Sequence, residues 1–418
     1  METLENLRIK IKLAGKNNDW QQVLELAGQL IENYPGQVNA WDKFWLAKAS
    51  FMLNMPDRAD SICTGLLVAN PDFDACKKLK VRLLWQKLKG TGDIVLAKAI
   101  FKNMVNLTGD DFWLSMGVLR LASLYMNKGK YDAALKILES YKHLDYPQDV
   151  KTLPDGHKIP SNYELFNLKL MKCYVKLEKF DEAVSLFETL NTNKFTSNRR
   201  KWLGYYYALA LSGKGNYWEA IDRLLQVPDL RRQWFVWFDI ARIAANAGNR
   251  DAALFFAVKS LTEFGKPDIY KAKALTFIAG HLPETGKHSL ALALLCYLER
   301  LYKEQGFKIP SQVEEWLEEF GTDFEDGGCA GFAQYDIKKI LHEILESERY
   351  QGRIYSIKGK YGFIQGDDGE ILYFFMGNLK CDKKVPEIGT RVRYNTGWSF
   401  DRKKRQLSKQ AINIEIVE

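Results

Sequence analysis

The chain has 418 residues, of which 46% are hydrophobic and 27% charged, an ordinary composition for a globular protein of two to four domains. Its net charge of +8 is mildly basic and does not by itself establish a nucleic-acid partner. The first residues lack the apolar segment of a signal peptide, and no apolar run approaches the roughly 18 residues that span a bilayer. We therefore expect a soluble cytoplasmic protein without a membrane partner.

Charge is unevenly distributed along the chain, and the cysteines are scattered. Residues 350–418 hold 13 Lys+Arg against 8 Asp+Glu, whereas the rest of the chain holds 47 against 44. The C-terminal segment is therefore the denser positive field. The six cysteines show no CxxC spacing. We predict reduced thiols in the core, and neither a disulfide framework nor a zinc site.

Residues 1–310 are rich in Leu, Ala and Lys and repeat a pattern of two helices joined by a small turn. The second helix opens with an acidic residue before a small residue, as in 124–141 and 173–190. The small residues, taken as anchors, are separated by 36, 38, 37, 49, 37, 33 and 38 positions. The anchors are Val23, Ala59, Ala97, Ala134, Ala183, Ala220, Ala253 and Ala291.

This pattern resembles the tetratricopeptide repeat, whose period is about 34 residues. Tyr125 and Tyr174 stand where the family places an aromatic residue on the first helix, and Pro35 and Pro71 stand where proline closes the unit. We therefore expect a mainly α protein with a solenoid of about eight helical hairpins. The resemblance implies a curved surface that binds a peptide or a partner protein.

Two features of this region have alternative interpretations. The 49-residue interval contains an insertion at 142–162, whose prolines and Asp-Gly stop the helix. The insertion is either a binding loop or a surface connection. Aromatic residues are dense in 202–210 and 231–244, where they either line the partner surface or pack between helices.

Residues 311–349 are expected to hold terminal helices around a flexible linker. An acidic helix ends near Phe320, and the Gly/Asp-rich segment 321–332 follows. A last helix then covers 337–350. The acidic linker either only connects its neighbours or docks on the basic C-terminal domain when nucleic acid is absent.

From residue 350 the apolar pattern changes to period two, which indicates strands. Asp367-Asp368-Gly369 and Glu387-Ile388-Gly389 mark turns. Five short strands in a segment of this size predict a small Greek-key barrel of the OB type over 350–418. The predicted strands are 352–357, 360–365, 371–376, 390–395 and 411–417.

This segment resembles the cold-shock domain. Tyr361-Gly362-Phe363-Ile364, after the basic Lys360, is similar to the family's first ribonucleoprotein motif, and residues 372–376 are similar to the second. Residues 389–394 and 411–414 correspond to its fourth and fifth strands. Ser356 stands where the family usually has an outward Trp, and Phe375 replaces the His of the second motif.

The resemblance implies that alternate rings face outward and stack on unpaired bases. These rings are Tyr361, Phe363, Tyr373 and Phe375, while the core would be formed by Ile364, Leu372, Phe374 and Met376. Trp398 and Phe400 are further candidates for stacking. The candidates for phosphate contacts are Lys358, Lys360, Arg391, Arg393, Arg402 and Lys403. Two alternatives remain: the rings are buried or cover an interface with the solenoid, and the run 402–405 is a solvated loop.

No nucleotide-binding, metalloprotease or hydrolase motif is present, and the five histidines form no ligand-spaced pair. We expect no enzyme activity, no cofactor and no metal. The sequence predicts an adaptor whose barrel binds single-stranded RNA or DNA and whose solenoid binds a protein. The alternatives are an interaction scaffold whose barrel does not bind nucleic acid and a non-catalytic subunit of a nucleic-acid-processing complex. The oligomeric state stays open.

Overall fold

The chain divides into two compact units. The computed structural model describes residues 3–227, 229–262, 268–321, 336–346, 349–380 and 386–417. The first unit comprises residues 1–179 and 189–200, and the second comprises 180–188 and 201–418. The predicted linker after Gly321, with its proposed docking on the basic domain, lies outside the described residues. The domain boundaries expected near 310 and 350 stay predictions.

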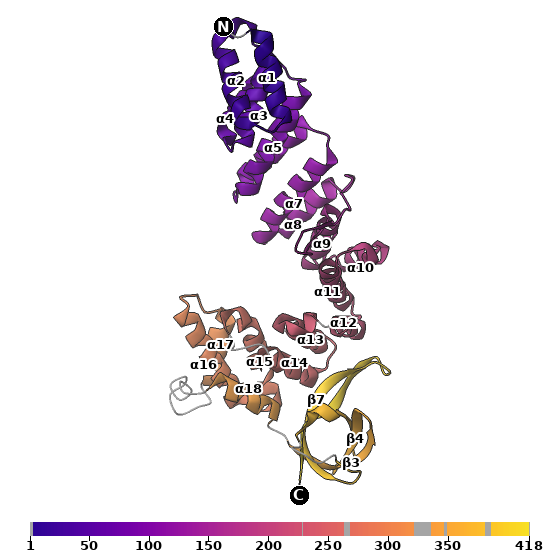
Figure 1. The fold of residues 1–418 in the computed structure, drawn as a ribbon. Coiled ribbons are helices and arrows are strands. Elements are labelled where there is room, and N and C mark those ends of the chain that lie inside the picture. Colours follow the sequence, from indigo (N-terminus) through magenta and orange to yellow (C-terminus); the bar gives the residue numbers. More distant parts are fainter. Residues whose placement is uncertain are drawn as a thin grey trace. The chain divides into compact units, whose positions relative to one another are not determined.

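Helices dominate both units, and within the described residues α1 to α16 follow one another as eight pairs (Figure 1). This confirms the predicted tetratricopeptide-like solenoid of eight hairpins. The earlier helices are α1 (Leu4–Lys16), α2 (Trp20–Asn33), α3 (Ala40–Met52), α4 (Pro56–Ala69), α5 (Asp74–Gly90), α6 (Ile94–Leu107), α7 (Asp111–Asn127), α8 (Tyr131–Ser140) and α9 (Asn162–Lys176). The later ones are α10 (Phe180–Thr189), α11 (Ser197–Gly213), α12 (Tyr217–Leu225), α13 (Trp234–Asn246), α14 (Arg250–Thr262), α15 (Ala272–His281) and α16 (His288–Glu304).

The anchor residues occupy equivalent positions in the structure. Each of the eight is the fourth residue of an even-numbered helix, and each is fully buried, with 0% of its surface exposed. A small side chain at this point lets the neighbouring helix approach closely, because no long side chain has to be accommodated between the two backbones. The repeat period read from the sequence therefore reports a real packing constraint.

The turn before each second helix has a backbone feature that sequence analysis missed. In seven of the eight pairs, the residue five positions before the anchor has a left-handed φ between 58° and 83°. Glycine adopts this conformation without a steric penalty, whereas other residues do so at a cost. The seven residues are Asn18, Asn54, Gly129, Glu178, Gly215, Gly248 and Gly286.

The insertion at 142–162 is a surface element whose first part is anchored. Tyr146 is 4% exposed, and its ring centroid lies 4.2 Å from that of Phe166 on α9. Two short strands that sequence analysis did not predict, β1 (Lys151–Thr152) and β2 (Lys158–Ile159), then pair antiparallel and remain exposed. The insertion is thus a surface connection with a small hairpin, and its role as a binding loop stays a prediction.

The C-terminal region contains two helices and a sheet. Helix α17 (Ser311–Gly321) ends where predicted, but α18 (Ile337–Glu346) is shorter than expected, because Tyr350 already begins the first strand of the sheet. The strands are β3 (Tyr350–Lys358), β4 (Tyr361–Gly366), β5 (Ile371–Phe375), β6 (Leu379–Lys380), β7 (Arg391–Asp401) and β8 (Gln406–Ile416). All five predicted strands are present; β6 is additional, and β7 and β8 form a longer hairpin than predicted.

The sheet rolls up but is not fully closed. Its order is β5-β4-β3-β7-β8-β6, and β8 also pairs in parallel with β5. This second contact comprises only two residue pairs, Tyr373 with Gln410 and Phe374 with Ala411. The predicted C-terminal sheet is confirmed, and it forms a partly open barrel, not a closed one.

The structure bears on two further expectations, which concern the state of the cysteines and membrane-spanning helices. Cys63, Cys76 and Cys173 are buried free thiols, as predicted. Cys296 is disulfide-bonded, so the expectation of reduced thiols is wrong at that position. In the part of the chain that the structure describes, no helix combines the length and apolarity needed to cross a membrane.

Candidate nucleic-acid interface

Strands β4 and β5 present one face to a core and one to solvent. Ile364, Leu372 and Phe374 are at most 3% exposed and pack in the small core of the sheet, while Met376 is partly buried at its edge. Because side chains alternate along a strand, the intervening residues must point outward. The predicted division into core residues and outward rings is therefore what the structure shows for these two strands.

The outward residues form a continuous cluster of four rings, called here the ring face: Tyr361, Phe363, Tyr373 and Phe375. Tyr361 pairs with Phe375 across the two strands, and Phe363 pairs with Tyr373. The ring centroids of Tyr361 and Tyr373 are 5.7 Å apart, and those of Phe363 and Tyr373 are 6.1 Å apart. Tyr361, Tyr373 and Phe375 are 39%, 36% and 47% exposed and Phe363 is partly buried, so the interpretation that all four rings are buried does not hold.

Gly362 lies between Tyr361 and Phe363 in the sequence, and its small size is needed for packing in the core of the sheet. A Cβ atom at this position would lie 2.5 Å from the Ser356 carbonyl oxygen and 2.6 Å from the Phe374 ring. The small residue thus lets β4 approach β3 and the core phenylalanine.

The neighbouring strand β3 adds residues that sequence analysis missed. Its register with β4 shifts between Ile354 and Ser356, so that Tyr355 lies in a bulge beside the ring face and is 56% exposed. Ser356 pairs with Phe363, which confirms that no large ring occupies this position. Arg353 is exposed and pairs with Arg391 on β7. Alternation along β3 could have indicated that Arg353 points outward. The bulge at Tyr355 could not be predicted in this way, because it depends on how β3 pairs with β4.

The predicted basic residues of this sheet lie on β3, on β7 and in the turn between β3 and β4. Lys358 pairs with Tyr361 and is exposed, and Lys360 is exposed in the turn between β3 and β4. Arg393 is exposed on β7, opposite Gln351. Arg391 already forms an ion pair, with its guanidinium 2.7 Å from Asp367, so a phosphate would have to compete for it. Cations therefore border the rings on the β3 side.

Trp398, Phe400, Arg402 and Lys403 belong to the β7–β8 hairpin, which lies against the solenoid of the second unit. Trp398 and Phe400 are partly buried against the helical core, and Leu407 on β8 is 5% exposed within it. Arg402 Nε lies 3.6 Å from Asp222 Oδ1 on α12. Trp398, Phe400 and Arg402 therefore contact the helices and are not part of the ring face. Lys403 is exposed at the hairpin tip and does not join the ring face.

Gly397 explains how the hairpin comes so close to the helices. A Cβ atom at this residue would lie 3.0 Å from the Phe255 ring on α14 and 2.9 Å from Ile412 on the adjoining strand. Glycine therefore permits the contact between β7 and α14. Local sequence patterns do not predict this packing, because it joins elements about 140 residues apart.

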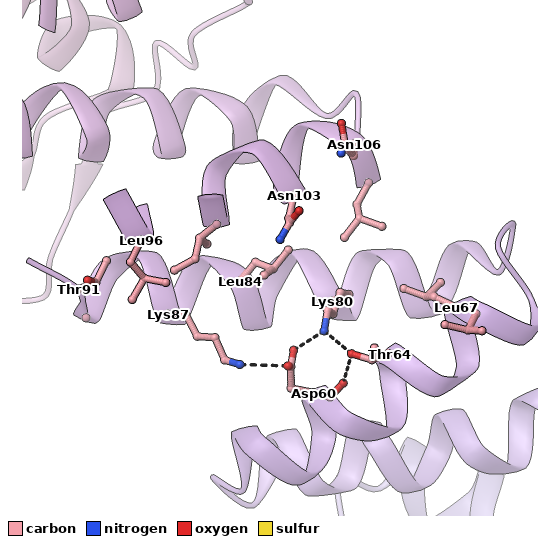
Figure 2. A pocket seen from close by; sticks show the side chains of 14 residues that line it. Asp60, Thr64, Leu67, Lys80, Leu84, Lys87, Thr91, Leu96, Asn103 and Asn106 are labelled. Carbon is pink, nitrogen blue, oxygen red and sulfur yellow. Dashed lines mark hydrogen bonds and ion pairs between the residues drawn. The ribbon is translucent and has the colours of Figure 1, made fainter. Parts of the chain in front are cut away.

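A second candidate site is a groove of about 880 Å³ in the first unit, over α5 and between α4 and α6 (Figure 2). Its apolar lining includes Val68 and Leu96, which are 80% and 51% exposed. Lys80 Nζ lies 2.6 Å from Asp60 Oδ1, and Lys87 Nζ lies 3.0 Å from Asp60 Oδ2. Burial alone would raise the pKa of Asp60, but hydrogen bonds from the two lysines outweigh it and hold the pKa below its ordinary value.

Comparisons with known proteins support the helical part of this description. A family model for the tetratricopeptide repeat matches residues 118–147. A second model, described as a domain of unknown function (DUF7017), matches residues 201–321. Neither match reaches the C-terminal sheet. No curated protein matches the sequence. The repeat match and the eight helix pairs define a tetratricopeptide-like solenoid protein with a C-terminal β-sheet.

Solved structures show similar but distant folds. A tetratricopeptide repeat protein from Parabacteroides merdae ATCC 43184 is 14% identical, with 76% of this chain and 98% of that chain covered and a TM-score of 0.36. YrrB, described as a TPR protein with an unusual peptide-binding site, is 15% identical, with coverages of 50% and 94% and a TM-score of 0.34. MamA is 22% identical, with coverages of 42% and 94% and a TM-score of 0.29. These scores are too low to carry an argument about function.

Proposed function

We propose that the protein is a non-enzymatic adaptor whose C-terminal sheet binds single-stranded RNA, or single-stranded DNA, and whose solenoid binds a protein partner. The observation that carries the first half is the ring face. Four aromatic side chains lie together on the outside of a sheet whose core is already filled by other residues. Exposed rings beside cations are the arrangement that unpaired bases and their phosphates require.

The energetics favour an unpaired strand as the ligand. A base stacked on an aromatic side chain contributes about 1–3 kcal/mol and needs no particular base identity. In a duplex the bases are already stacked on each other, so the rings gain nothing from it without unwinding. RNA is preferred over DNA in this proposal because single-stranded RNA, with splayed bases, is the usual ligand of stacking platforms of this kind.

The second half of the proposal is supported by the repeat architecture. Stacked helical hairpins expose extended surfaces that serve as partner sites in repeat proteins. The groove over α5 is one such surface. The alternative is a scaffold whose sheet does not bind nucleic acid, and the repeat match supports the solenoid that such a scaffold would use. A non-catalytic subunit of a nucleic-acid-processing complex would use the same two surfaces.

Fluorescence anisotropy with labelled single-stranded RNA tests the ring face in the full chain. The double variant Tyr361→Ala/Phe363→Ala removes two stacking partners, and we expect affinity to fall at least about 30-fold. Tyr270→Ala is the matched control, because Tyr270 is an aromatic residue of the solenoid that is 82% exposed. Binding that is equal in wild type and double variant would favour the scaffold alternative.

A further inference from the structure

The groove over α5 has an apolar surface that is exposed to solvent. Its walls belong to α4 and α6, the second helices of two successive pairs, and its floor is a stripe of α5 that includes Leu84. Val68 on α4 and Leu96 on α6 are 80% and 51% exposed. Apolar side chains gathered along one groove are unfavourable in water, and such patches commonly mark interaction sites. Contact with an apolar partner would remove this cost.

The floor of the groove carries a net positive charge. Lys80 and Lys87 on α5 both reach Asp60 on α4, at 2.6 Å and 3.0 Å (Figure 2). Lys80 also donates a hydrogen bond to Thr64 Oγ1, at 2.7 Å, and is mostly buried. The Lys87 side chain is 41% exposed, and an ammonium group has three donors. Because two ammonium groups share the one carboxylate that lines the groove, Lys87 can bind a carboxylate of a ligand.

The α6 wall presents two side-chain amides, from Asn103 and Asn106. Both are exposed, and within the described part of the chain neither amide has a hydrogen-bond partner. Residues three apart on a helix share a face, with about 5–6 Å between their Cβ atoms. Alternate residues of an extended chain recur at about 6.5–7 Å, so the two amides match two successive backbone groups on one edge of such a chain. A helical ligand would leave these amides unused, because its backbone groups are bonded internally.

We propose that this groove binds an extended segment of a partner protein, in which apolar residues flank an acidic one. The site rests on the solenoid half of the proposed function and specifies the chemistry of that partner. Asn103 and Asn106 would hold the backbone of the segment, and Lys87 its carboxylate. The stretch of α5 from Lys80 to Gly90 is about 15 Å long, which corresponds to about four or five extended residues. A nucleic acid fits less well, because no aromatic residue lines the groove to stack on its bases.

A random decapeptide library displayed on phage tests this chemistry without a known partner. The full chain is immobilised, enriched peptides are sequenced, and the affinity of the synthetic peptides is measured by fluorescence anisotropy. We expect the enriched peptides to share an acidic residue with apolar residues on both sides. A library from which no peptide is enriched over the bare support, or a consensus without an acidic residue, would contradict the proposal.

A matched pair of variants locates the bound peptide. Leu96→Glu places a charge on the apolar wall, and we expect the affinity to fall at least about tenfold. Val95→Glu is the control, because Val95 is the neighbouring residue in the first turn of α6, is 78% exposed and does not line the groove. Both glutamates lie near a helix N-terminus, where a negative charge is stabilising, so both variants should keep α6 folded. Equal affinities of the two variants would overturn the proposal.

A double-mutant cycle tests the contact with Lys87. Changing the acidic residue of the peptide to its amide should weaken binding to wild type about threefold, as expected for a partly exposed ion pair. The same change should not affect binding to Lys87→Met. Lys89→Met removes an exposed lysine of the same helix that does not line the groove, and it should behave as wild type does. An equal loss in wild type and Lys87→Met would exclude the carboxylate contact.

The same variants separate this groove from the other half of the proposed function and from self-association. RNA affinity should be unchanged in Leu96→Glu, because the ring face is a different surface. Peptides that bind wild type and Leu96→Glu equally would remove only this groove and leave the solenoid half of the proposed function standing. If light scattering showed an oligomeric wild type and a monomeric Leu96→Glu variant, the occupant would be a second copy of the chain, and the proposal would fail.

Discussion

Replacing Lys169 by methionine should stabilise the protein at neutral pH. Methionine has a similar length, fills the same space and needs no counter-ion, while Ser123 keeps its hydrogen bond to the Leu119 carbonyl oxygen. The pKa of Lys169 falls from 10.5 to about 8 on folding, because burial and neighbouring cations disfavour the ammonium. At about 1.4 kcal/mol for each pKa unit, and with a reduction for the solvent that the side chain retains, the gain in unfolding free energy is about 2–3 kcal/mol.

The pH dependence of this effect has a definite sign. Below about pH 8 the lysine is protonated in both states, so the full penalty applies to the folded state. Between about pH 8 and 10.5 the unfolded chain binds more protons than the folded one, so wild-type stability should rise with pH. The advantage of Lys169→Met should shrink over the same range and vanish above it.

Native-state hydrogen exchange of the α9 amides, read by mass spectrometry on the full chain, measures this local free energy. Lys176→Met is the control, and we expect it to change stability by less than about 0.5 kcal/mol, because its side chain is exposed. A Lys169→Met variant that is less stable than wild type at pH 7, or a difference that does not vary with pH, would refute the reasoning.

Three further predictions address the turns, the hairpin and the ring face. Glu178→Gly should raise the unfolding free energy by about 0.5–1 kcal/mol, because glycine adopts the left-handed φ of 58° without strain, and Gly129→Ala should lower it by about 1 kcal/mol; urea titration measures both. Leu407→Ala should cost about 2–4 kcal/mol locally and speed hydrogen exchange in β7 and β8 while leaving RNA affinity unchanged; slower or unchanged exchange would mean that the hairpin is not held by this packing. Lys358→Ala should weaken RNA binding and reduce the slope of log affinity against log salt by about 0.7, whereas an unchanged slope would remove Lys358 from the phosphate contacts.

Much of the helical fold could be predicted because one constraint repeats. A buried small residue is needed wherever two helices approach closely, and the eight anchors recur at nearly the repeat period. The left-handed turn residue before them was harder to see, because Asn18, Asn54 and Glu178 occupy positions where glycine would have been a clear signal. In this solenoid, close helix packing is therefore easier to predict from local sequence than the backbone conformation of the turns is.

The C-terminal sheet shows where sequence reasoning stops. Alternation along β4 and β5 separated core residues from the ring face, because a strand has only two sides. Alternation does not distinguish a ring facing solvent from one facing a helix, so the sequence leaves Trp398 and Phe400 as further candidates for stacking. Their contact with the helical core, the ion pair of Arg391 with Asp367 and the bulge at Tyr355 all depend on segments distant in the chain.

Ultraviolet crosslinking of the full chain to uridine-rich single-stranded RNA, followed by mass spectrometry of the linked peptides, tests the central claim most directly. If the ring face stacks on bases, the crosslinked peptides should contain Tyr361, Phe363, Tyr373 or Phe375, and excess unlabelled duplex should not compete. Crosslinks confined to the helices or to the tip of the β7–β8 hairpin, or no crosslinks at all, would contradict the proposal that this sheet binds single strands.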